Sequence, residues 1–315
     1  MTERILVTGG AGFIGANIAA TLSHQPGTDV VVVDNFTSGD WKNLMHIDCQ
    51  VRAADCNDPD LLQEIADGEY AAIFHQAAIT DTTIMDQRYM LEVNTNAFAE
   101  LLEASYCSGT RMIYASSAGT YGNSPAPNQV GKGEEPANIY GFSKLAMDRI
   151  AKRWYDRHPA PIIGLRYFNV YGPGEGHKDK TASMILQLYH QIKSGARPRL
   201  FKYGEQRRDF VYIRDVIDAN MAALQAASSG VCNVGSGQSR CFNDIIKSLE
   251  KALDLTLDVD YFDNPYDFYQ NHTEADINTS VELLGWTPRW HLEDGVAEYI
   301  RMLESGHAGA VEAPA

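Results

Sequence analysis

The sequence predicts an α/β fold in which a doubly wound parallel sheet is joined to a smaller α/β domain. A short apolar run, residues 5–7, leads into a glycine-rich turn and then into a stretch with helical period from residue 17. Further apolar runs alternate with helical patterns, at 30–33, 51–54, 72–75, 112–115 and 162–165. This alternation is typical of a parallel sheet with crossover helices. From residue 168 the pattern changes to shorter, mixed elements, which indicates a second domain.

The glycine-rich turn after the first strand has the spacing of a dinucleotide-binding loop. Gly9 permits the tight turn, Gly12 lets backbone N–H groups approach a pyrophosphate, and Gly15 lets the helix pack against the strand. A glycine cluster can also be a plain turn, but its position directly after a strand and before a helix favours nucleotide binding. The expected contacts with the cofactor are Gly9, Gly10, Gly12, Phe13, Ile14 and Gly15.

The ends of the next two strands carry polar residues that suit an adenosine. Asp34 ends the second strand about twenty residues beyond the glycines, where a carboxylate accepts hydrogen bonds from the ribose and favours NAD. Asn35 and Lys42 follow in a loop that can take a 2′-phosphate instead, so the choice between NAD and NADP stays open. Asp55 follows the third strand and is expected beside the adenine.

The fourth strand, residues 72–75, ends in small residues that let a cofactor lie close to the backbone. These are Gln76, Ala77 and Ala78. His75 before them is expected to be a packed residue at a strand end and not a catalytic base. A single long helix is predicted over 89–107, and Asn94 on it is expected to bridge to the next loop and to lie among the cofactor-binding residues.

A phenol and an ammonium lie four residues apart at the start of an amphipathic helix, at Tyr140 and Lys144. That spacing puts both side chains on one helix face, where a cation favours the phenolate over the phenol. Ser117 follows the fifth strand, at the sheet edge where ligands bind in such folds, and is expected to polarise a substrate hydroxyl or carbonyl. The Tyr-x-x-x-Lys spacing alone is weak evidence for a catalytic pair. The glycine turn, Asp34 and Ser117 together strengthen it.

Composition excludes several other classes of function. A formal charge of −15 disfavours nonspecific binding to nucleic acid or anionic membranes. Five cysteines without paired spacing fit reduced thiols. No signal-peptide layout opens the chain and no apolar run approaches the roughly 18 residues of a membrane span, so we expect a cytoplasmic protein. No metal site is predicted.

Together, these motifs resemble the extended short-chain dehydrogenase/reductase family, whose nucleotide-binding part has a Rossmann-like fold. The resemblance covers nearly the whole chain. Segments 166–173 and 208–212 are similar to those of the family's nucleotide-sugar enzymes, whereas the loop after the fifth strand lacks the Thr-Asp-Glu triplet of its 4,6-dehydratases. Gly176-His177-Lys178, with 182–184 and Tyr269-Gln270, resembles the ADP-heptose 6-epimerases, which serve lipopolysaccharide biosynthesis.

The resemblance implies a nucleotide-sugar epimerase that oxidises C6 of ADP-heptose transiently, holds NADP and assembles as a homo-oligomer, a pentamer. It implies that Tyr140 and Lys178 act as proton acceptors for the two epimers, with Ser117 on the oxyanion. The alternative for Lys178 is a phosphate-contacting or exposed lysine. Tyr140, Lys144 and His177 are also expected at the cofactor. The expected substrate contacts are Ser117, Asn169, Lys178, Ser183, Phe201, Arg208 and Tyr269.

Two rival interpretations remain at this point. A UDP-hexose 4-epimerase would use the same keto chemistry one ring position away, although it would not be expected to carry the Gly-His-Lys segment. A nonenzymatic dinucleotide sensor would be expected to have lost Tyr140 or Lys144, and both are present.

The predicted domain boundaries follow from the element pattern. Residues 1–167 with 208–241 are expected to form the dinucleotide-binding domain, 168–207 with 242–304 the substrate domain, and 305–315 a flexible tail. Within the second domain we expect helices over 181–193, 242–253 and 274–284, strands over 199–201 and 255–259, and core positions for Trp286 and Trp290.

Overall fold

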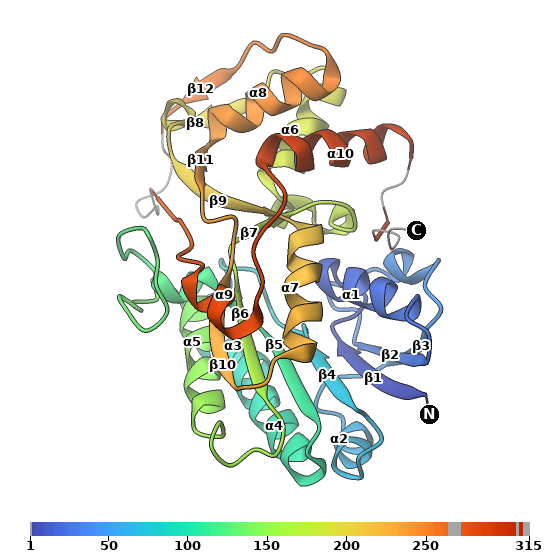
Figure 1. Ribbon diagram of the computed structural model, residues 1–315. Coiled ribbons are helices and arrows are strands. Elements are labelled where there is room, and N and C mark those ends of the chain that lie inside the picture. Colours follow the sequence, from blue (N-terminus) through green and yellow to red (C-terminus); the bar gives the residue numbers. More distant parts are fainter. Residues whose placement is uncertain (1, 264–271, 307–308, 311–315) are drawn as a thin grey trace.

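A seven-stranded parallel sheet forms the centre of the larger part of the molecule (Figure 1). The computed structural model describes residues 2–263, 272–306 and 309–310. The strand order is β10-β6-β5-β4-β1-β2-β3. From β1 the chain first adds β2 and β3 on one side, and then adds β4 and the later strands on the other side. The strands are β1 (Glu3–Thr8), β2 (Thr28–Asp34), β3 (Gln50–Ala53), β4 (Ala72–His75), β5 (Arg111–Ser117), β6 (Ile162–Tyr167) and β10 (Gly230–Val234).

Helices cover both faces of this sheet because successive side chains along each buried strand point to opposite faces. Val30 and Val32 of β2 pack in the same core as α1 (Phe13–Ser23) and α7 (Ile213–Gln225). Val31 and Val33 pack in a second core, with α2 (Pro59–Ala66), α4 (Ala97–Ser108) and α5 (Ile139–Lys152). The predicted doubly wound architecture is therefore confirmed.

The long helix predicted over 89–107 is interrupted. Helix α3 (Gln87–Leu91) passes through a π-helical turn, η2 (Glu92–Asn96), before α4 begins. A π turn inserts an extra residue without breaking the apolar period clearly, so the sequence pattern did not reveal it. Asn94 lies within this turn and is buried.

The smaller part of the molecule contains two small sheets with helices around them. β7 (Asn169–Tyr171), β9 (Arg207–Tyr212) and β11 (Ser239–Cys241) form one, and β8 (Arg199–Phe201) pairs with β12 (Asp260–Phe262) in the other. The helices of this part are α6 (Met184–Lys193), α8 (Phe242–Leu253) and α10 (Leu292–Glu304), and its short 3-10 turns are η4 (Gly176–Thr181) and η5 (Lys202–Gly204). Helix α9 (Asn278–Leu284) and the 3-10 turns η1 (Trp41–Leu44) and η3 (Ala118–Tyr121) lie in the larger part, against β10, α1 and α5 respectively.

Three predicted elements are shifted. The strand expected over 255–259 is not formed, and the strand lies at β12 instead. The helix expected from 181 begins at Met184, because Ser183 caps it by accepting from the N–H of Leu186. The helix expected from 274 begins at Asn278, and it ends at Gly285 in a left-handed conformation, φ 65°, as the glycine stop predicts.

The predicted domain boundaries separate elements that share a sheet or a contact in two places. β9 and β11, expected in the dinucleotide-binding domain, pair with β7 in the separate small sheet, whereas β10 and α7 belong to the large one. α9, expected in the substrate domain, lies against β10. Apolar period identifies an element but not the sheet it joins, and one continuous core links both parts. The predicted tail falls largely outside the described residues.

In the part of the chain that the structure describes, no helix is long and apolar enough to cross a bilayer. Trp286 is buried, and Trp290 is half-buried with the Arg214 guanidinium 6.0 Å from its ring centroid.

Candidate active site

The glycine turn between β1 and α1 leaves no room for side chains. A Cβ on Gly9, which has φ 68°, would lie 2.5 Å from the backbone nitrogen of Ala77, and one on Gly15 would lie 2.2 Å from the carbonyl oxygen of Gly9. Gly12 is the N-cap of α1 and provides no side-chain cap, so the N–H groups of the first turn are not satisfied by a capping side chain. This cradle fits the pyrophosphate of a dinucleotide.

Asp34 anchors this turn from the end of β2. One carboxylate oxygen accepts from the N–H of Ala11 at 2.9 Å and the other from the N–H of Phe36 at 2.8 Å. The Asn35 amide donates to Asp55 at 2.7 Å, which joins the ends of β2 and β3, and Lys42 is exposed on η1. The predicted adenosine-side residues thus lie on neighbouring strand ends.

Asn43 is a residue of this region that the sequence did not indicate. Its buried amide donates to the carbonyl of Ala11 at 3.0 Å and lies 3.1 Å from Nδ1 of His177. It therefore ties the glycine turn to a segment more than 130 positions away in the chain. No local pattern signals such a contact, because asparagine in a loop is usually a turn former.

At the end of β4, His75 is fully buried and shares a hydrogen bond of 2.8 Å with Thr8. Burial, followed by the charge of Lys144, lowers the pKa of His75 to about 3, so the imidazole stays neutral at working pH. The prediction of a packed histidine is confirmed. Next to it, the amide Nε2 of Gln76 is buried and has no hydrogen-bond partner among the described residues, as suits a group facing a ligand.

Asn94, within the π turn, hydrogen-bonds with two other segments of the chain. Its side chain exchanges hydrogen bonds with the backbone of Ile79, at 2.8 and 3.0 Å, and donates to Ser143 at 3.1 Å. The prediction of a bridge to the next loop is wrong, because Asn94 reaches the loop before the helix instead, and the same amide also holds α5. The start of α5 is fixed in addition by Asn138, whose side chain accepts from the N–H of Gly141 at 2.8 Å.

Tyr140, Ser117 and Lys144 converge at the end of β5. A Cβ on Gly119 would lie 3.3 Å from Ser117 Oγ and 3.5 Å from Tyr140 Cε1, so the two side chains flank one glycine. Burial raises the pKa of Tyr140, and a hydrogen bond with Ser117 lowers it. The Lys144 ammonium, almost fully buried, donates to the carbonyl of Ala115 at 2.8 Å.

The expectation that Lys144 depresses the pKa of Tyr140 is wrong for this structure. The net shift of the Tyr140 pKa is upward, because burial outweighs the hydrogen bond with Ser117. Burial also lowers the pKa of Lys144 to about 8, against the opposing charge of Asp148. The lysine is therefore a cation only in part of the working pH range.

Lys178 lies against the first turn of α1. Its ammonium is 5.7 Å from the ring centroid of Phe13, and burial lowers its pKa while Glu175 raises it. The segment that carries it is held by Glu175, whose buried carboxylate accepts from the N–H and hydroxyl of Ser183 at 2.6 and 2.7 Å. Since the Ser183 hydroxyl also caps α6, its polar atoms are already engaged.

The remaining predicted substrate residues are distributed over the small sheets. Asn169 is exposed at the start of β7, and the ring of Phe201 lies 5.9 Å from that of Phe262. Arg208 is almost fully buried in β9 and donates to the carbonyl of Arg207 at 2.8 Å. Tyr269 lies outside the described residues.

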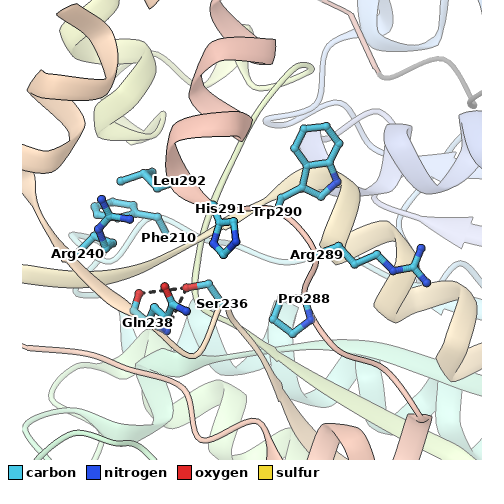
Figure 2. A pocket seen from close by; sticks show the side chains of 9 residues that line it. All are labelled: Phe210, Ser236, Gln238, Arg240, Pro288, Arg289, Trp290, His291 and Leu292. Carbon is cyan, nitrogen blue, oxygen red and sulfur yellow. Dashed lines mark hydrogen bonds between the residues drawn. The ribbon is translucent and has the colours of Figure 1, made fainter. Parts of the chain in front are cut away.

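A separate pocket of about 100 Å³ lies between the β10–β11 loop and the segment before α10. Figure 2 shows the side chains that line it. Its lining residues are Phe210, Ser236, Gln238, Arg240, Pro288, Arg289, Trp290, His291 and Leu292. None of these is a predicted site residue. We place the candidate active site at the ends of β1, β4 and β5, where the glycine turn and the Ser117, Tyr140 and Lys144 side chains lie.

Replacing Gly15 by alanine is expected to abolish stoichiometric cofactor binding. The added carbon would meet backbone atoms of Gly9 and Gly10 at 2.2–2.9 Å, so the turn or α1 must move, at a cost of about 1–3 kcal/mol in folding stability. Nucleotide content of the purified protein and its Tm measure both effects. Gly309→Ala, where nothing lies within 4 Å of the added carbon, is the control. A variant that retains full cofactor content would contradict the assignment of the turn.

A family model and several known proteins match this chain. The model of the NAD dependent epimerase/dehydratase family matches residues 5–235. An ADP-L-glycero-D-manno-heptose-6-epimerase of Thiobacillus denitrificans is 37% identical over 337 residues, covering 97% of this chain and 100% of that protein.

Two solved structures share the fold over nearly their whole length. The Helicobacter pylori ADP-L-glycero-D-manno-heptose-6-epimerase has a TM-score of 0.90 and 44% identity, covering 96% of this chain and 97% of that one. The UDP-N-acetylglucosamine 4-epimerase of Methanobrevibacter ruminantium, solved with UDP-N-acetylmuramic acid, has a TM-score of 0.89 and 27% identity, covering 97% and 100%. With the glycine cradle and the Ser117, Tyr140 and Lys144 cluster in place, these matches show that the chain belongs to the NAD dependent epimerase/dehydratase family.

Proposed function

We propose that this protein converts ADP-D-glycero-D-manno-heptose to ADP-L-glycero-D-manno-heptose by transient oxidation at C6, a reaction that serves lipopolysaccharide biosynthesis. The observation that carries the proposal is the second basic side chain at the site. Lys178, in addition to the Ser117, Tyr140 and Lys144 cluster, lies at the first turn of α1 and belongs to the segment that resembles the heptose epimerases. The names of two relatives at 37% and 44% identity support the same substrate.

Inversion at C6 needs an oxidation because the C6–H bond of a polyol has no adjacent carbonyl to acidify it. A nicotinamide cofactor held by the glycine turn would supply reversible hydride transfer at C6, which would allow inversion by way of a ketone. The site residues then have three tasks, which are to bind the nucleotide, to hold the sugar, and to move the proton of the C6 hydroxyl. Net redox change over the cycle is zero, so the cofactor does not need to leave.

The proton of the C6 hydroxyl is assigned to two different acceptors. Tyr140 serves one epimer, with Ser117 donating a hydrogen bond to the oxygen as charge develops on it. Lys178 serves the other, because the sugar presents its hydroxyl in the opposite direction after the ketone has turned in the site. The lowered pKa of Lys178 fits a group that must both accept and return a proton.

A UDP-hexose 4-epimerase is the second candidate, favoured by the close fold match to the Methanobrevibacter ruminantium enzyme. The deciding experiment offers purified protein ADP-D-glycero-D-manno-heptose and UDP-galactose in parallel. Conversion of the ADP-heptose alone supports the proposal, and conversion of UDP-galactose alone would replace it by the second candidate. Conversion of neither, by protein with its nucleotide bound, would favour the dinucleotide sensor.

Two finer points belong to this proposal. The cofactor is NADP, with the 2′-phosphate received by the loop that carries Asn35 and the exposed Lys42, and the chain works in the cytoplasm as a homo-oligomer, a pentamer by resemblance. Denaturing the protein and testing the released nucleotide for a 2′-phosphate checks the first, and the native mass in solution checks the second. Release of NAD alone would contradict the NADP assignment.

A further inference from the structure

Behind Tyr140 and Lys144 lies a buried polar network centred on Asp148, which the proposed mechanism does not use. One carboxylate oxygen accepts from the Tyr114 hydroxyl at 2.9 Å, and the other accepts from Ser116 Oγ at 3.1 Å and from Arg166 Nε at 2.9 Å. Asp148 and Arg166 are 6% and 2% exposed, so this is an ion pair inside the protein. A buried pair of this kind does not by itself add much stability, so its position needs another explanation.

The network fixes the register of α5 against β5. Three consecutive residues at the end of β5 each lie beside a residue of α5. The carbonyl of Ala115 accepts from Lys144, the hydroxyl of Ser116 donates to Asp148, and the side chain of Ser117 flanks Gly119 together with the ring of Tyr140. Because the three contacts share one helix and one strand, a slip of α5 would break all of them together.

Asp148 also lies one helical turn beyond Lys144, which places the two side chains on the same helix face. The other titratable groups that face the ammonium are Cys56, on the segment after β3, and His75, at the end of β4. Burial raises the pKa of Cys56 to about 12 and lowers that of His75 to about 3. Both are neutral at working pH. Among the described residues that face Lys144, Asp148 therefore supplies the negative charge.

We propose that Asp148 is a positioning residue for the Tyr140 and Lys144 pair, which it serves in two ways. Through Ser116 and Tyr114 it locks the helix that carries both groups onto the strand that carries Ser117. Through its charge it keeps the buried Lys144 ammonium protonated, so that a cation stands one helical turn from the phenol. It does not touch the reacting atoms.

Arg166 offsets the cost of burying the Asp148 charge. It pairs with Asp148 on one side and with Glu134 on the other, at 2.8 and 2.7 Å. Glu134 lies on the loop that leads from β5 to α5, and its side chain is 22% exposed. Lys144 and Arg166 balance Asp148 and Glu134, so the four charges sum to zero. Glu134 thus offers a matched control, because its loss disturbs Arg166 without removing the carboxylate that faces Lys144.

The test is to titrate Lys144 directly. NMR of protein labelled at the lysine Cε, with the Lys144 signal assigned by its loss in Lys144→Arg, gives the midpoint without any substrate. We expect a midpoint near pH 8 in the parent protein and a fall of about one pH unit in Asp148→Asn. Glu134→Gln and the charge-conserving Asp148→Glu are expected to keep the parent midpoint. A parent midpoint retained in Asp148→Asn would overturn the proposal.

Asp148→Asn leaves Arg166 with a buried charge that has lost a partner, so it can fail to fold. The double variant Asp148→Asn with Arg166→Met removes both charges of the pair, and in it too the Lys144 midpoint is expected to fall. The effect on catalysis rests on the proposed function. There, the alkaline limb of kcat on ADP-heptose should move to lower pH together with the Lys144 midpoint. If the Lys144 midpoint falls in Asp148→Asn but the parent protein does not turn over ADP-heptose, the proposed substrate is refuted. The role of Asp148 is then still supported.

Discussion

Tyr140→Phe is expected to slow epimerisation of ADP-heptose by about 10²–10⁴-fold, the range that removal of a general acid or base produces. The hydroxyl that accepts and returns the substrate proton is lost, while the ring, the N-cap of α5 by Asn138 and the hydrogen bonds of Asn94 are kept. Cofactor content and Tm should therefore stay close to those of the parent. The measurement is the rate of interconversion of the two epimers, separated by chromatography.

Tyr106→Phe is a suitable control for this experiment. Tyr106 is 41% exposed on α4, and its ring lies 5.1 Å from that of Trp154, so its hydroxyl has no role in the site. It should retain parent activity. If Tyr140→Phe also retained activity within tenfold, Tyr140 would not be the proton acceptor.

Lys178→Met is expected to reduce epimerisation by a similar factor while cofactor stays bound. Methionine keeps an unbranched apolar side chain over the ring of Phe13 but cannot accept a proton. If two acceptors serve the two epimers, the loss is one-sided. One epimer should still reduce the bound cofactor through Tyr140 in a single turnover, and the other should not. Absorbance of the reduced nicotinamide reports this directly.

Lys180→Met changes a neighbouring lysine that is exposed on the same turn, and it should leave both epimers active. Full activity of Lys178→Met would refute the two-acceptor mechanism. Loss of cofactor together with activity would instead indicate that Lys178 holds a phosphate, which is the alternative that its position beside α1 leaves open.

Local sequence patterns predicted the elements on which the site is built. The glycine spacing after the first strand, Asp34 at the end of the second, and the Tyr140 and Lys144 spacing on one helix are all short-range features, fixed by backbone sterics and helical period. The strand over 255–259 and the continuous helix over 89–107 were wrong. An alternating pattern is not sufficient for pairing, and a π turn leaves the apolar period nearly intact.

Contacts between distant segments could not be predicted from such local patterns. Asn43 reaching His177, Glu175 holding Ser183, and Asp148 paired with Arg166 join elements that only the folded chain brings together.

The sequence by itself determined the fold class, the nucleotide turn and the Tyr140 and Lys144 pair. The turn and the pair each depend on residues within one turn or one helix. The tertiary structure decided how those groups are charged. Burial raises the pKa of Tyr140 and lowers that of Lys144, and the charge of Asp148 opposes the shift at Lys144. How deeply these side chains are buried depends on packing between elements far apart in the chain.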